Sequence, residues 1–263
     1  MTIDAAYVVS GLLVGLLVGL TGVGGGSLMT PLLTAVFGIS PSVAVGTDLA
    51  FAAITKGAGT VVHRLRKSVD WNIVKLMCLG SVPASILTSF LLYALDIHKA
   101  EKGSTVDLFI RYSIAVCVLL TAASLIFKKR IIAWQQAHPG RQLHGLKLTA
   151  ATVGAAAIIG FLVTVSSIGA GAIGATVLIM LYPRLQPSEV AGTDIAYAVP
   201  LTAVAAMGHV ILGTLNWGLL AALLLGSIPG ISIGSYLSRS VPERLLRGIL
   251  ATTLTAVAVK LVS

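Results

Sequence analysis

Long apolar runs alternate along the chain with short polar segments, and this pattern predicts an all-α membrane protein. A run of about 18 or more apolar residues with few charges is typical of a membrane-spanning helix. Runs of this kind lie at 42–62, 71–95, 108–127, 188–211, 217–237 and 245–262. Together with shorter apolar stretches they occupy most of the sequence, which leaves no room for a separate soluble domain.

Two further apolar stretches are interrupted by clusters of small residues. The run at 5–20 is followed by residues 21–27, which read TGVGGGS, and then by a second short apolar stretch. The run at 148–164 is followed in the same way by residues 166–171, which read SSIGAG. Glycine destabilises helices, and each flanking stretch falls short of the roughly 20 residues that a full span needs. We therefore predict a hairpin of two short helices in each half of the chain.

The two halves of the chain repeat each other. A shift of 146 positions superimposes several uncommon residues, namely Pro41 on Pro187, Asp48 on Asp194, His63 on His209, Trp71 on Trp217 and Pro83 on Pro229. The glycine clusters align with a shift of 145, which places Gly24 on Gly169. Repeats of this kind indicate a duplicated module. We predict a first transmembrane repeat at 1–127, a basic cytoplasmic linker at 128–147 and a second transmembrane repeat at 148–263.

The distribution of basic residues predicts that the second repeat is inverted in the membrane. Lys and Arg favour loops on the cytoplasmic side. The basic loop at 64–67 corresponds to the uncharged loop at 210–214, whereas the loop that follows in the second half carries Arg239, Arg244 and Arg247. Inversion places nearly all loop Lys and Arg residues inside. The expected fold is a polytopic integral membrane protein with two inverted-topology repeats, each with a Gly-broken re-entrant hairpin plus three transmembrane helices.

Composition supports the membrane assignment and excludes other classes. The chain is 56% hydrophobic and 10% charged, whereas ordinary soluble domains are about 25% charged. The net charge of +9 follows from loop topology, so we expect no nucleic-acid partner. Cys78 and Cys117 lie in apolar runs and offer neither a disulfide framework nor metal spacing. Metalloprotease, Walker A and G-x-S-x-G motifs are absent, so we expect no enzyme, no metal site and no cofactor.

The glycine clusters are candidate anion-binding sites. Each second short helix is predicted to begin near the middle of the bilayer, where free backbone N–H groups and the helix dipole favour an anion. Glycine allows close approach to the backbone, and neighbouring hydroxyl groups add donors. The candidate substrate-binding residues are Gly24, Gly25, Gly26, Ser27, Thr21, Ser166, Ser167, Gly169 and Gly171. The alternative is close helix packing through small residues.

Ionisable residues inside the predicted spans are candidate coupling groups, because charge within a bilayer is costly. Asp48 and Asp194 either couple to protons or another cation, or hydrogen bond to a neighbouring broken helix. Lys56 lies in mid-span, where it either pairs with an acid or contacts an anionic substrate; Thr202 is its counterpart. Two histidines at matching span ends have either a proton role or an interfacial one: His63 and His209.

Three short motifs resemble the TauE/SafE sulfite exporter family, also described as permeases of the 4-toluene sulfonate uptake type. They are residues 22–28 (GVGGGSL) with Pro31, residues 42–47 (SVAVGT) and residues 80–83 (GSVP), and the second half repeats them in weaker form. The resemblance covers nearly the whole chain. It implies movement of small sulfur-containing anions such as sulfite and organosulfonates. It also implies a multi-pass protein of the bacterial cytoplasmic (inner) membrane.

Inverted repeats with glycine-interrupted helices are typical of secondary transporters whose site lies near the bilayer midplane. We therefore predict an exporter or permease that works by alternating access and is driven by protons, with sodium left open as the coupling ion. The expected partners are a small anionic substrate, the lipid bilayer and the coupling ion, and a homodimer is compatible with the sequence. The alternatives are a passive anion channel of the same architecture and a non-transporting membrane scaffold.

Overall fold

The computed structural model describes residues 5–21, 26–65, 67–95, 105–137, 143–237 and 252. These residues are helical or lie in short connections, and no strand occurs among them. The helices are α1 (Ala5–Thr21), α2 (Gly26–Ala35), α3 (Pro41–Leu65), α4 (Trp71–Ala94), α5 (Thr105–Ala137), α6 (Gly145–Ser166), α7 (Ala172–Leu181), α8 (Pro187–Ile211) and α9 (Trp217–Leu237). The predicted all-α class is thus confirmed for the described part of the chain.

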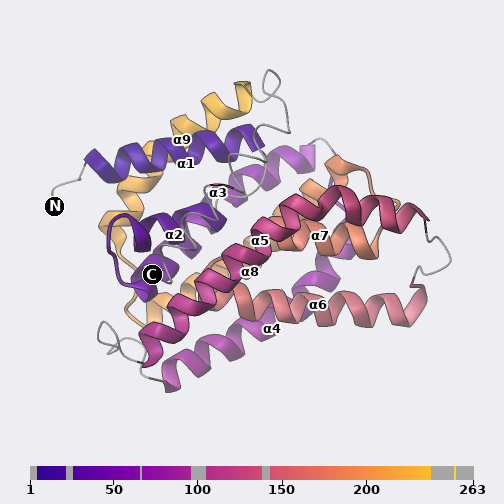
Figure 1. Ribbon diagram of the computed structural model, residues 1–263, viewed down its shortest axis with the longest axis horizontal. Coiled ribbons are helices and arrows are strands. Elements are labelled where there is room, and N and C mark those ends of the chain that lie inside the picture. Colours follow the sequence, from indigo (N-terminus) through magenta and orange to yellow (C-terminus); the bar gives the residue numbers. More distant parts are fainter. Residues whose placement is uncertain are drawn as a thin grey trace.

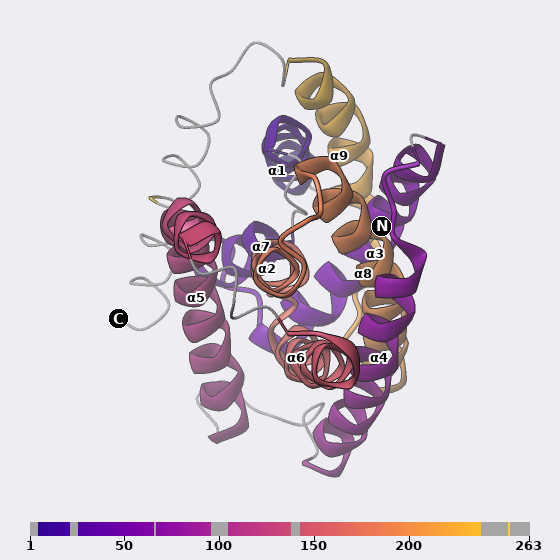
Figure 2. The same cartoon turned by 90° about the vertical axis from the view of Figure 1, so that its right-hand side faces the viewer.

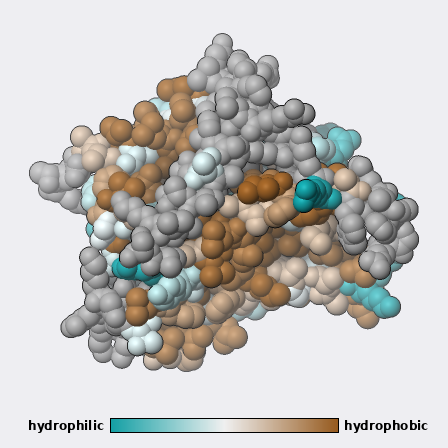
Figure 3. Space-filling view, in the orientation of Figure 1, coloured by the Kyte–Doolittle hydropathy of each residue, from teal (hydrophilic) through white to brown (hydrophobic). Residues whose placement is uncertain are grey.

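Five helices among the described residues are long and apolar enough to cross a membrane. They are α4, α6 and α8, together with the segments Leu108–Phe127 of α5 and Trp217–Gly234 of α9. Helix α3 is as long as α8, but Asp48 and Lys56 lower its hydropathy and it does not belong to this group. Figure 3 shows hydrophobic residues over the centre of one face and hydrophilic residues toward its margins. Of the predicted span at 245–262, only residue 252 belongs to the described residues.

The long helices pack in pairs around a central layer of short ones. Helix α1 packs along α9, α4 along α6, and α3 along α8 (Figure 1). The two short helices α2 and α7 lie in the centre of the second view (Figure 2), where α5 covers one side of them and α3 and α8 cover the other. The segments on either side of each glycine cluster therefore contact helices from both halves of the chain.

Small residues allow the paired helices to approach closely, and these contacts recur in both halves. Gly80 of α4 lies against the carbonyl of Val153 in α6, and Gly226 of α9 lies against the carbonyl of Val8 in α1. A Cβ atom at either glycine would overlap that backbone. Close backbone approach through small residues is the usual packing mode of helices in membranes. Each pair therefore joins the first broken helix of one half to a later span of the other.

Two hydrogen bonds connect corresponding positions across the molecule. The amide of Asp70 donates to Thr193 Oγ1 at 3.0 Å, and the amide of Asn216 donates to Thr47 Oγ1 at 3.2 Å. Each bond joins the loop after one long helix to the start of its counterpart. Helices α3 and α8 are therefore antiparallel, with the end of each beside the beginning of the other.

Helix starts follow from local capping chemistry. Asp70 precedes α4 and its Oδ1 accepts from the amides of Asn72 and Ile73, which would otherwise lack intrahelical partners. Helix α8 begins with Pro187 at its first position, where the missing N–H costs nothing. Helix α5 continues to Ala137, so about half of the segment predicted as a linker is helical.

Candidate functional site

The second cluster of small residues breaks the helix as predicted. Helix α6 ends at Ser166 and α7 begins at Ala172. The intervening backbone has φ values of 60° at Ser167, 127° at Gly169 and 147° at Gly171, a region that glycine adopts far more readily than other residues. Ser166 Oγ accepts from the amide of Ile168 at 3.1 Å. The hydroxyl of Ser166 therefore closes the turn, and every residue of the break is buried.

The two helices that flank this break form a hairpin. The hydroxyl of Tyr182, directly after α7, lies 2.8 Å from Oγ1 of Thr152, which is in the first part of α6. Helix α7 thus runs back along α6, with the break at the far end of the hairpin. Ser124 of α5 donates to the carbonyl of Ala172 at 3.0 Å and ties the start of α7 to α5.

The first cluster lies partly outside the described residues. Gly24 and Gly25 belong to the segment 22–25, which is not described. Helix α1 ends at Thr21, and α2 begins with Gly26 and Ser27. The start of the second short helix near the middle of the bilayer and the anion-binding role of these residues stay predictions.

Asp48 of α3 is fully buried and holds α2 in place. Its Oδ2 accepts from the amide of Thr30 at 3.2 Å and from the hydroxyl of Thr30 at 2.6 Å. The second distance is typical of a hydrogen bond to an ionised carboxylate. The other carboxylate oxygen, Oδ1, is buried without a hydrogen bond, and so is Oγ of the nearby Ser167. Asp48 therefore binds the first broken segment and faces the break of the second.

Asp194 of α8 lies at the matching place against α7. Its Oδ1 and the Tyr197 hydroxyl are side by side next to Gly174, in the first turn of α7. A Cβ atom at Gly174 would overlap both oxygens. Glycine at this position therefore lets α7 pack directly on the polar face of α8.

Lys56 joins the two acidic positions. Its Nζ donates to the carbonyl of Ala170, inside the second break, and the ammonium group interacts electrostatically with both Asp48 and Asp194. These three residues are the buried Asp, Glu, Lys and Arg side chains of the described chain, with exposed fractions of 0% for Asp48, 5% for Lys56 and 4% for Asp194. Lys56 therefore lies near both acids and at the second break, while contact with an anionic substrate stays a prediction.

The two predicted histidines have different surroundings. His209 is buried, its Nδ1 lies 2.8 Å from Thr214 Oγ1, and its Nε2 lies 3.1 Å from the carbonyl of Thr164. A carbonyl only accepts, so Nε2 carries a hydrogen. His63 is half-buried and its Nδ1 lies 2.9 Å from Ser68 Oγ. His209 therefore links α8 to the end of α6; the coupling role of both residues stays a prediction.

Three residues of this cluster were not foreseen from the sequence. Tyr197 is three positions after Asp194, a spacing that places both on one helix face, and this signal was available. Thr30 and Gly174 carry no such signal, because their contacts to Asp48 and Asp194 depend on how the hairpins fold back.

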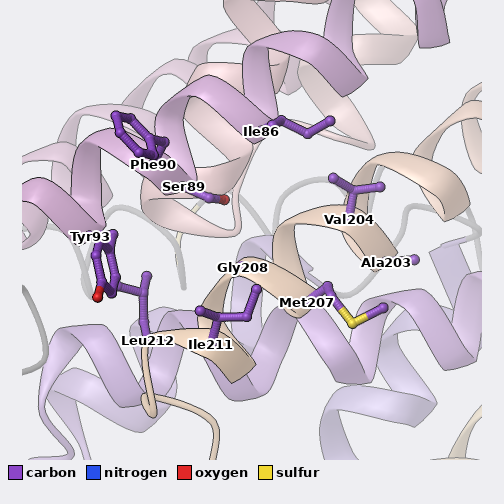
Figure 4. A pocket seen from close by; sticks show the side chains of 10 residues that line it. All are labelled: Ile86, Ser89, Phe90, Tyr93, Ala203, Val204, Met207, Gly208, Ile211 and Leu212. Carbon is purple, nitrogen blue, oxygen red and sulfur yellow. The ribbon is translucent and has the colours of Figure 1, made fainter.

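Two cavities lie outside the cluster. One, of about 530 Å³, is an apolar groove between α4 and α8 lined by residues such as Phe90, Tyr93 and Met207 (Figure 4). The other, of about 680 Å³, lies where the starts of α4, α6 and α8 meet and is lined partly by His144 and Arg184. Neither contains Asp48, Lys56 or Asp194, which are enclosed by packed helices.

Comparisons with known proteins cover almost the entire chain. The family model described as "Sulfite exporter TauE/SafE" matches residues 7–261. A probable membrane transporter protein, YjnA of Bacillus subtilis (strain 168), is 38% identical over 98% of this chain and 100% of its own length. Another, YunE of the same organism, is 25% identical over 97% of this chain and 96% of its own length. No solved structure matches the chain.

Proposed function

The chain belongs to the TauE/SafE sulfite exporter family, and on this premise we propose that it is a secondary transporter of small anions. Family, relatives and apolar helices together make it a multi-pass membrane transporter. The observation that carries the finer proposal is the buried cluster. A single lysine, from the first half, donates to the broken helix of the second half and faces one acid from each half.

We infer that the two repeats are inverted relative to each other. The supporting observation is that α3 and α8, which correspond in sequence, are antiparallel and exchange matching hydrogen bonds at their ends. A two-fold axis in the membrane plane relates antiparallel counterparts in this way. On this proposal each broken hairpin enters from one side and returns to it, and irregular backbone is placed where protein surrounds it.

The proposed anion site lies at the break between α6 and α7. Ser167 Oγ is buried without a hydrogen bond, Gly169 and Gly171 adopt positive φ angles and add no side chain there, and α7 presents its N-terminal end there. The N-terminal end of a helix favours anions, and Lys56 supplies a full positive charge. The family description favours sulfite and related sulfur-containing anions as the substrate class.

The proposed coupling groups are Asp48 and Asp194, with protons as the driving ion. Both carboxyl groups are buried at the places where the broken hairpins contact the long helices. Acids in this setting are typical of proton relays in transporters. Alternating access would then move one repeat against the other around the site, with the cytoplasmic membrane of a bacterium as the expected location.

Flux through purified protein in liposomes tests the transporter proposal. A transporter accumulates a radiolabelled anion, such as sulfite, against its own gradient when a pH gradient is imposed. A passive channel only equilibrates the anion, and a scaffold moves none. Accumulation that disappears when a protonophore collapses the pH gradient is the expected result; equilibration without accumulation would contradict proton-coupled transport.

A further inference from the structure

We propose that Asp48, Lys56 and Asp194 form a charge-balancing triad that accepts one monovalent anion together with one proton. This inference rests on the proposed anion transport and adds to it the charge of the substrate and the stoichiometry. It starts from the observation that the three side chains are at most 5% exposed and gather at the break between α6 and α7. Lys56 donates to the carbonyl of Ala170, Asp48 lies near Ser167, and Asp194 lies against Gly174.

The triad contains one cation for two acids. If all three groups were ionised, the site would carry one uncompensated negative charge in the protein interior, which is strongly unfavourable. One proton on either carboxyl group restores neutrality. Asp48 accepts two hydrogen bonds from Thr30, an arrangement that suits its ionised form.

The surrounding titratable groups do not alter this count. Tyr197 lies beside Asp194, and the thiol of Cys78 on α4 lies near Tyr197; both are ordinarily neutral at pH 7. His209 approaches α3 next to Gly46, and its two ring nitrogens contact a hydroxyl and a carbonyl. The neighbours of Asp48 from α2 and from the break are Thr30 and Ser167, which carry no charge.

An entering anion changes the balance by its own charge. To reach the ammonium group of Lys56 it must replace the carbonyl of Ala170, the present hydrogen-bond acceptor. The added negative charge is matched when the remaining carboxylate takes up a second proton. A monovalent anion therefore enters with one proton in an electroneutral step, whereas a divalent anion would leave the buried site negative.

The second half lacks an equivalent cation. Thr202 occupies the position that corresponds to Lys56, and its hydroxyl donates to the carbonyl of Ala198 within its own helix at 2.7 Å. Among the described residues the two-fold arrangement thus offers two buried acids but a single buried lysine or arginine. We infer one anion site per chain, at Lys56, rather than two symmetric sites.

The experiment uses the full chain in liposomes with a pH-sensitive dye inside. Two monovalent probes, methanesulfonate and benzenesulfonate, are compared with the divalent probe sulfate, and valinomycin with potassium sets the membrane potential. We expect an inward gradient of a monovalent probe to acidify the lumen at a rate that does not depend on the potential. Sulfate should move at least about tenfold more slowly.

The outcomes separate this inference from the proposed function. A potential-dependent rate, a transport current or sulfate flux equal to that of methanesulfonate would overturn the triad while leaving anion transport intact. Absence of flux for every monovalent probe would overturn both. Proton movement equal to anion movement, measured with labelled methanesulfonate, supports the one-to-one stoichiometry.

Variants locate the effect in the triad. Lys56→Met should reduce methanesulfonate flux at least about 100-fold, and Lys56→Arg should restore part of it because the charge returns. The matched control is Thr202→Val at the corresponding position, where flux should be unchanged. The double variant Asp48→Asn with Asp194→Asn should move the anion without protons and with a current; retained proton coupling in a folded double variant would contradict the proposal.

Discussion

The two halves of the molecule share a backbone plan but differ in the chemistry at its centre. In the first half Asp48 accepts from the hydroxyl and amide of Thr30. In the second half Asp194 lies beside the Tyr197 hydroxyl and Gly174. Lys56 is present only in the first half, since its counterpart is Thr202. The acids and the helix contacts recur in both halves, while the buried lysine belongs to one half.

The comparison of the two halves distinguishes the contacts that hold the helices together from the residues of the central cluster. Contacts that recur in both halves, such as those of Gly80 and Gly226, hold pairs of helices together. Features found in one half, above all Lys56 and the close packing at Gly174, make the central cluster asymmetric. Substitutions at corresponding or chemically matched positions in the two halves should therefore have unequal effects.

Among substitutions in the second half, Gly174→Ala is expected to cause the largest loss of stability. A Cβ atom there overlaps the Tyr197 hydroxyl and Asp194 Oδ1, so Gly174→Ala should lower the free energy of unfolding by about 1–3 kcal/mol, the usual cost of overpacking. It should also impair transport, because α7 is displaced from α8. Gly154→Ala in α6 is the matched control, since a Cβ atom there meets no other group within 4 Å. Equal thermal stability of the two variants in detergent would contradict this account.

The two histidines should also differ in how much each contributes to stability, and this difference should be smaller than the one between Gly174 and Gly154. His209→Ala leaves the carbonyl of Thr164 without its imidazole donor near the end of α6, where helix carbonyls lack intrahelical partners. An unsatisfied buried acceptor costs about 1–3 kcal/mol. His63 is half-buried, with its Nδ1 bonded to Ser68, so His63→Ala should cost less than His209→Ala. Thermal unfolding of both variants measures this, and a larger loss for His63→Ala would refute the asymmetry.

The smallest loss of stability is expected from a substitution at Thr30. Thr30→Val removes the hydroxyl donor to Asp48 but keeps the backbone amide bond. The second half already lacks this hydroxyl, because Ala175 corresponds to Thr30. Loss of a hydrogen bond to a charged group costs about 1.5–3 kcal/mol. The retained bond from the Thr30 amide should make the loss of stability smaller than that. Ala175→Thr introduces the corresponding hydroxyl in the second half and is the matched change. A similar loss of thermal stability in Thr30→Val and Ala175→Thr would contradict the expected difference between the two halves.

The sequence predicted the elements of this fold better than their contacts. The spans and the break at 166–171 follow from hydropathy and glycine content, which act locally. The basic segment at 128–147 is predicted as a linker, yet Lys and Arg are good helix formers and α5 continues into it as far as Ala137. The basic residues therefore end the apolar segment that can cross a membrane, but they do not end helix α5.

The candidate site was predictable in its acids but not in its geometry. Asp48 and Asp194 stand out because charged residues are rare in apolar runs. The bond from Lys56 to the carbonyl of Ala170 joins residues 114 positions apart, and no periodic pattern reveals it. Ser166 and Ser167 look equivalent in the sequence, yet Ser166 closes the turn and Ser167 Oγ has no hydrogen bond. The difference arises from the left-handed backbone at Ser167.

The most direct test of the account concerns the inversion of the two repeats. Leu65 and Ile211 are corresponding positions at the ends of α3 and α8, and both side chains are exposed, at 79% and 73%. Single cysteines at these positions, in a chain with Cys78 and Cys117 replaced by alanine, can be labelled with a membrane-impermeant maleimide in intact cells and in inverted vesicles. The account predicts that Ile211→Cys reacts from outside and Leu65→Cys only in inverted vesicles. Reaction of both from the same side would contradict it.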